Sequence, residues 1–213
     1  MSWLITPQIK SLDGVPVGTP YGGGYIAGFI SHTADGNPTH ALIVAPRATG
    51  ATGSSQWKTT ATTTAGTGSS FDGAANTAAM VTAGIDDHPA AQFCVNLSIG
   101  GFTDWYLPAR YELDIAYFNL KPSTDANSTS LGTNIYAVPQ RNINWTTTYP
   151  AQTALTAFNT TAEAFVADNH WSSSENTGFA IYGWFVNFFS GFQGDFRLKT
   201  NGLRVRAFRR IAL

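Results

Sequence analysis

The sequence contains little cysteine and little charge. Cys94 is the single cysteine among 213 residues, so the chain can form no internal disulfide. It lies in the apolar, helix-like segment AAQFCVNL, which predicts a buried, unreactive thiol and gives no support for a Cys–His nucleophile. Only 12% of the residues are charged, about half the usual share, so Thr, Ser, Asn, Gly and Ala must cover much of the surface. This composition favours a tightly packed extracellular or virion protein over a cytosolic enzyme.

Several other classes of protein lack their sequence signals here. The formal net charge of -1 provides no basic surface for nucleic acid. No apolar stretch approaches the roughly 18 residues of a transmembrane helix, so we expect no membrane insertion. The opening segment MSWLITPQIK lacks the apolar core of a signal peptide, so we expect no export signal. Neither a G-x-S-x-G elbow nor a phosphate-binding loop is present. The four histidines are His32, His40, His88 and His170. No two of them have the spacing of zinc ligands, so neither a metal nor a cofactor is predicted.

Glutamate is also scarce. Glu112, Glu163 and Glu175 are far apart in the sequence. A carboxylate pair for glycoside hydrolysis can still form from Glu112, Glu175 and one of the ten aspartates. Because that many carboxylates would bring some pair together by chance, no enzyme is predicted.

The order of the expected elements is that of a single α+β domain. Residues 1–20 contain three prolines and little periodicity, which indicates an extended N-terminal arm for attachment or subunit contact, followed by one domain over 21–213. The apolar runs at 22–30 and 40–46 flank Asp-Gly and Asn-Pro turn signals and predict a β-hairpin. Residues 47–72 are rich in small residues and predict a loop pinned by Trp57.

Helices are expected over 72–84 and 86–97, and a third is entered at Pro108. Residues 121–170 are polar and irregular. Three strands then follow, near 179–189, 192–199 and 203–211, with turns predicted at Ser190–Gly191 and Asn201–Gly202. The Asn-Gly pair between the last two strands predicts a hairpin. In the basic tail LRVRAFRR, alternation places Arg204 and Arg206 on one face of a strand. The alternative interpretation of these arginines is an anion-binding site.

The segment FAIYGWFVNFFSGFQGDF, from Phe179 to Phe196, is dense in aromatic residues and has Asp195 as its one charge. A strand with one buried face alternates apolar and polar residues, but Phe185, Phe188 and Phe189 place rings on both faces. The segment is therefore either a strand buried on two sides or one whose second face is kept for a partner.

A set of motifs in a fixed order resembles a known family. GFTDWYLPARYEL is followed by HWSSSEN, by a strand around GWFVNF, and by Gly191, Lys199 and RVRAFR near the end of the chain. This order is similar to that of the C-type lectin-like domains of phage tail-fibre receptor-binding proteins and related bacterial adhesins, including the variable proteins of diversity-generating retroelements. The likeness covers roughly residues 20–211. It departs at Ala207 and Phe208, where the family usually has Pro-Val, and it lacks the Glu-Pro-Asn and Trp-Asn-Asp motifs of calcium-dependent sugar sites.

The resemblance implies an α+β, C-type lectin-like fold with two helices, antiparallel sheets and long irregular loops. It also implies fixed core positions at Trp184, Val186 and Phe188, so that period-two alternation sends Phe185, Asn187 and Phe189 to the opposite face. In retroelement proteins that face is diversified through adenine-rich codons. Between Asn176 and Leu203 the residues that such codons cannot produce are Trp184, Gln193 and Lys199.

The resemblance thus implies a phage receptor-binding protein at a tail fibre or tail tip, located in the virion. No catalytic residue is predicted. It would bind a host cell-surface protein or glycan, contact other tail proteins and form a homotrimer. The same face can instead serve subunit assembly in a structural virion protein, or the chain can be a bacterial surface adhesin. A related fold includes formylglycine-generating enzymes, whose cysteine or copper chemistry Cys94 does not support. The expected ligand-binding residues are Asn176, Phe179, Ile181, Tyr182, Phe185, Asn187, Phe189, Phe192, Asp195, Phe196, Arg197, Thr200 and Asn201.

Overall fold

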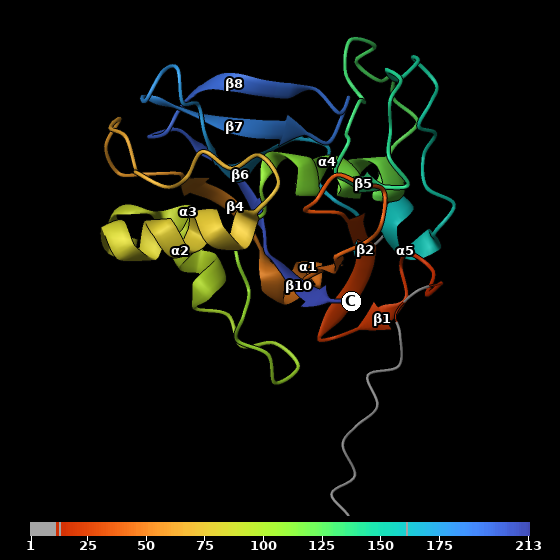
Figure 1. Cartoon of the computed structure of the whole chain (residues 1–213), viewed down its shortest axis with the longest axis horizontal. Helices are drawn as coiled ribbons and strands as arrows, with labels where there is room; N and C mark the ends of the chain where they lie inside the picture. Colours follow the sequence, from red (N-terminus) through yellow and green to blue (C-terminus); the bar gives the residue numbers. More distant parts are fainter. Residues whose placement is uncertain (1–11, 13, 161) are drawn as a thin grey trace, which may run out of the picture.

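The computed structural model describes residues 12, 14–160 and 162–213. Within them the chain is a mixed α/β protein with two five-stranded sheets, which fits the predicted α+β class (Figure 1). The first sheet has the order β1-β2-β3-β10, with β5 also paired to β2. Its strands are β1 (Pro20–Tyr21), β2 (Gly24–Ile30), β3 (His40–Val44), β5 (Ala137–Val138) and β10 (Phe208–Ala212).

The second sheet has the order β4-β9-β6-β7-β8, which makes β8 an edge strand. Its β6 and β9 run parallel, and its other neighbouring strands run antiparallel. The strands are β4 (Ala51–Gln56), β6 (Asn169–Glu175), β7 (Tyr182–Asn187), β8 (Gln193–Leu198) and β9 (Gly202–Arg206).

Two helices are long, α2 (Gly73–Gly84) and α4 (Arg110–Leu120). The side chain of Asp72 accepts a hydrogen bond from the Ala75 N–H at 2.8 Å and so caps α2. The described residues contain more helices than the two that the resemblance implies, because short helical turns form where the chain bends between longer elements. These are α1 (Arg47–Gly50), the 3-10 helix η1 (Ile85–Asp87), α3 (Pro89–Val95) and α5 (Thr156–Asn159). Among the described helices, none is both long and apolar enough to cross a membrane.

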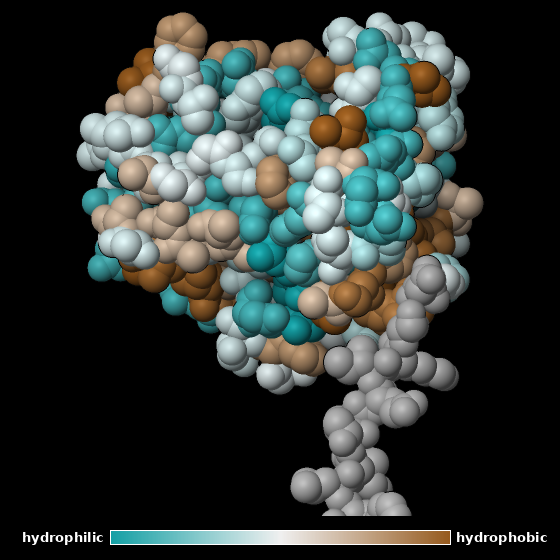
Figure 2. Space-filling view, in the orientation of Figure 1, coloured by the Kyte–Doolittle hydropathy of each residue, from teal (hydrophilic) through white to brown (hydrophobic). Residues whose placement is uncertain are grey.

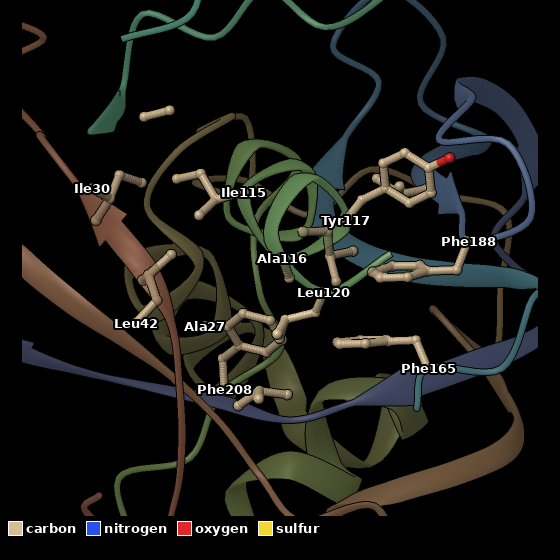
Figure 3. Packing of buried hydrophobic residues seen from close by; sticks show 14 of the residues in the cluster. Ala27, Ile30, Leu42, Ile115, Ala116, Tyr117, Leu120, Phe165, Phe188 and Phe208 are labelled. Atoms are coloured by element: carbon tan, nitrogen blue, oxygen red, sulfur yellow. The ribbon is translucent and has the colours of Figure 1, made fainter. Parts of the chain in front are cut away.

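The first sheet lies between two apolar clusters, because β3 is apolar on both faces. Leu42 and Val44 contribute to one cluster, and Ala41 and Ile43 contribute to the other. Figure 3 shows the first cluster, in which α4 packs between the N-terminal hairpin and the rings of Phe165 and Phe188, which lie just before β6 and just after β7. There the rings of Phe165 and Phe188 stack with their centroids 4.0 Å apart. In this cluster α4 therefore connects the two sheets, since it contacts β2 of the first and β6 and β7 of the second.

The hairpin predicted at 22–30 and 40–46 is confirmed as β2 and β3, whereas the predicted loop at 47–72 contains a strand. β4 has few apolar residues and is half-exposed, so its sequence carries no strand signal. It forms because its backbone pairs with β9 across a large sequence separation. Most of the segment HWSSSEN is likewise in a buried strand, β6, where the sequence predicted none.

The predicted strand at 203–211 is divided at Ala207, and the hairpin predicted at Asn201–Gly202 is wrong. β9 pairs with β4 and β6, whereas β8 pairs with β7. Ala207 marks the change of sheet, since its N–H donates to the Gly50 carbonyl and its own carbonyl accepts from the Ala45 N–H. The turn signal was correct about the reversal of the chain but not about which strands become neighbours.

The predicted N-terminal arm falls largely on residues 1–11 and 13, which lie outside the described residues. The described end of that arm belongs to the domain, because Leu12 is buried in the second apolar cluster. The Gly18 N–H also donates to the Ile26 carbonyl, and β1 then pairs with β2.

Candidate ligand-binding surface

The middle of β7 is buried on both sides. Val186 and Phe188 lie in the first apolar cluster, as expected for core positions. The same expectation is wrong for Trp184, which is half-buried and belongs to neither cluster. Phe185 is only 2% exposed and packs in the second cluster with Trp57 and Trp171. The expectation that Phe185 faces a ligand is therefore wrong, because a second core lies on the face that period-two alternation left open.

A bulge in β8 completes the cover over Phe185. Asp195 and Phe196 together lie opposite Trp184, between the Gly183–Arg197 and Phe185–Gly194 pairs. As a result the Phe196 ring meets the Phe185 ring edge-on at 5.5 Å, and the Arg197 guanidinium lies 5.6 Å from the centre of the same ring. Phe192 is half-buried beside them.

Exposed apolar side chains surround the edge strand at this end of the sheet. Phe179 is 66% exposed and Phe196 is 53% exposed. Tyr182 pairs with Leu198 across the two strands, and its ring centroid lies 6.4 Å from that of Phe179. We call this group the β7–β8 surface; its members are Phe179, Ile181, Tyr182, Phe196, Arg197 and Leu198.

Two of the expected polar ligand residues mainly shape the backbone. The Asn176 side chain is buried, accepts from the Gly178 and Phe179 N–H groups and donates to the Asp195 carbonyl at 3.0 Å. The Asn187 side chain accepts from two N–H groups of the β7–β8 turn and donates to Asn169. These bonds hold the two ends of the hairpin.

The remaining expected residues lie around the hairpin and are not all brought together. Phe189 is 49% exposed but lies in the β7–β8 turn, at the opposite end of β7 from Phe179. Thr200 is half-buried and Asn201 is exposed in the turn after β8. Leu198 was not predicted, although alternation along β8 from Phe196 would have placed both on one side.

A buried ion pair anchors the base of the β7–β8 surface. Lys199 Nζ lies 3.1 Å from Glu175 Oε2 and donates to the Thr62 carbonyl, while the Lys199 N–H donates to the Ile181 carbonyl. Burial lowers the pKa of Lys199. Burial acts to raise the pKa of Glu175, but hydrogen bonds from Thr63 and Thr64 and the ion pair hold it below its usual value. The end of β8 is therefore fixed to the loop after β4, so the surface rests on a rigid base.

The β7–β8 surface lies at one end of the molecule. In Figure 1, β7 and β8 run along the top, whereas β1 and the C-terminus lie in the lower half. Figure 2 shows brown and tan atoms along the same upper edge. A partner can thus approach the surface without contacting the end where the described chain begins.

The other groups considered for chemistry are held in structural contacts. Glu112 is fully buried and accepts from the Tyr106 hydroxyl and the Ala109 N–H, and burial raises its pKa to about 7. Cys94 is buried as predicted, and burial raises its pKa. No group of three or more possible metal ligands occurs among the described residues. Arg204 and Arg206 form ion pairs with Asp168 and Glu163.

No known family model matches the chain, and no curated protein is significantly similar to it.

Proposed function

We propose that this chain is a receptor-binding protein with a C-type lectin-like fold, carried at a phage tail fibre or tail tip. It recognises a host cell-surface protein or glycan through the β7–β8 surface. The observation that carries the proposal is the group of exposed apolar side chains around an edge strand, at the end of the molecule away from β1.

The chemistry of the surface suits recognition. Large apolar side chains left in water are unfavourable unless a partner covers them, so a contiguous group of them marks an interface. Aromatic rings and an arginine are the side chains that most often dominate binding energy. The Glu175–Lys199 pair and the Asn176 bonds fix the backbone beneath them, so little conformational freedom would be lost on binding.

The fold assignment rests on the order of the motifs and is supported by two long helices, by sheets that are antiparallel except for the β6–β9 pair, and by a long, mostly irregular segment between α4 and β6. The same resemblance implies the homotrimer, the virion location and the contacts with other tail proteins. Hypervariability is proposed for the exposed members of the surface and not for Asn176 or Phe185, whose side chains support the fold.

The test compares binding of the labelled, purified protein to a panel of intact bacterial strains. The double variant Phe179→Ser with Phe196→Ser removes the two most exposed rings of the β7–β8 surface. The control is Ile143→Ser, which removes an equally exposed apolar side chain outside that surface. We expect the wild type and the control to bind at least one strain, and the double variant to bind it about 30-fold more weakly, as for loss of a binding hot spot.

The oligomeric state of the same variants separates the rival function. If the double variant dissociates into monomers, the surface is a subunit interface and the proposed function is wrong. Equal cell binding by the double variant and the control would also contradict it.

A further inference from the structure

A small cavity lies beside the β7–β8 hairpin and is distinct from the β7–β8 surface. Its volume is about 160 Å³, below the roughly 300–1,000 Å³ of pockets for drug-sized ligands, so it has room for one small ring. Side chains from the start of α4, from the loop after it and from β7 and β8 line the cavity. Those used below are Arg110, Tyr111, Thr133, Trp184 and Gln193.

The guanidinium of Arg110 is held in this cavity without a counter-ion. It lies 4.3 Å from the centre of the Tyr111 ring and 4.1 Å from that of Trp184, so aromatic rings fix its position. Its Nε is buried and has no hydrogen-bond partner. Among the described residues, no carboxylate pairs with it and no acceptor bonds its two Nη atoms, which are open to solvent.

Other arginines of the protein show what Arg110 lacks. Arg141, Arg206 and Arg209 each form an ion pair, with Asp114, Glu163 and Asp104 respectively. A guanidinium held in a fixed plane with its outer edge free matches the two oxygens of a carboxylate, which it binds through paired hydrogen bonds. The cavity therefore presents one uncompensated positive charge in a shape that suits a single carboxylate.

The remaining polar groups add both hydrogen-bond donors and an acceptor. Gln193 Nε2 donates to Asp114 Oδ1 at 2.8 Å, which fixes the amide and leaves its Oε1 free to accept. In the described part of the chain, the hydroxyls of Tyr111 and Thr133 and the indole N–H of Trp184 have no partner either. An acidic amino-acid side chain needs donors alone, whereas the hydroxyls of a sugar use donors and acceptors together.

We propose that this cavity binds one carboxylated sugar residue, with its carboxylate on Arg110 and its hydroxyls on the surrounding polar groups. This inference rests on the proposed function, because it adds a second contact beside the β7–β8 surface for the same receptor and names that receptor as an acidic glycan. Arg110 sets the preference for charge, and Trp184 and Tyr111 hold its guanidinium in place.

The test titrates the purified protein with the methyl glycosides of glucuronic, galacturonic and N-acetylneuraminic acid, followed by saturation-transfer NMR and tryptophan fluorescence. Methyl glucoside and methyl galactoside are the neutral counterparts, and N-acetylaspartate methylamide represents an acidic peptide. We expect at least one acidic sugar to bind about tenfold more tightly than the neutral sugars, the difference of a charge-assisted hydrogen-bonded pair. Arg110→Gln should remove that preference and Arg110→Lys should restore part of it. Arg47→Gln, which removes another half-buried guanidinium outside the cavity, should leave it unchanged.

Equal binding of acidic and neutral sugars would overturn the proposal, as would binding of the aspartate compound alone or of none of the compounds. A preference that survives Arg110→Gln in a folded protein would overturn it as well. The proposed function is tested separately on cells. Cell binding without sugar binding contradicts the cavity assignment alone, and sugar binding without cell binding contradicts the proposed function alone.

Discussion

Phe185 and Phe189 are four positions apart in one hairpin and have opposite environments. Phe185 is 2% exposed among Trp57, Trp171 and the rings of β8, whereas Phe189 is 49% exposed in the turn. The family resemblance correctly placed Val186 and Phe188 in the core, but Trp184, its third core position, is only half-buried. Period-two alternation failed for Phe185 because it assumes that a strand has one buried face, and the second core includes residues distant in the sequence, such as Trp57.

Truncation of the two side chains measures this difference. We expect Phe185→Ala to lower the free energy of unfolding by about 3–5 kcal/mol, the usual loss for a buried phenylalanine. Phe189→Ala, the matched control, should change it by less than about 1 kcal/mol. Urea denaturation of both variants provides the measurement. Equal losses would mean that Phe185 does not occupy a second core.

The hairpin of β7 and β8 depends on a tight turn that the sequence did predict. Gly191 has φ +69°, in the left-handed region that favours glycine, and its N–H donates to the Asn187 carbonyl. The pairing of β9 was not predictable in the same way. A turn is encoded by the few residues within it, but the neighbours of a strand depend on distant residues, as β4 and β6 show.

A glycine substitution in the turn separates backbone strain from packing. In Gly191→Ala the new methyl group would overlap the rings of Trp145 and Tyr117, whereas in Gly101→Ala, at φ +82°, it would meet open space. Gly101→Ala should therefore cost only about 1–2 kcal/mol of left-handed strain. Gly191→Ala should cost clearly more and should lower the melting temperature further. Equal melting temperatures for the two variants would contradict the packing of this turn against the core.

The composition of the β7–β8 surface and of the cavity beside it depends on the arrangement of the whole molecule. Alternation and the family resemblance indicated that the aromatic segment carries a display surface. They did not predict Leu198, and they could not bring Arg110 next to Trp184, since these residues meet only when α4 packs against β7. The fold thus concentrates the exposed rings around edge strand β8 and places the cavity beside them.

A single engineered thiol tests most directly whether this surface is free in the assembled protein and binds the host. Cys94 is buried, with a raised pKa, so Phe196→Cys introduces one reactive thiol at the centre of the surface. We predict that a bulky maleimide labels this thiol in the proposed homotrimer within about tenfold of its rate in unfolded protein, because an exposed thiolate reacts freely. The labelled protein should keep its oligomeric state and lose cell binding. Slow labelling that becomes fast on dissociation of the oligomer, or full cell binding by the labelled protein, would contradict the account.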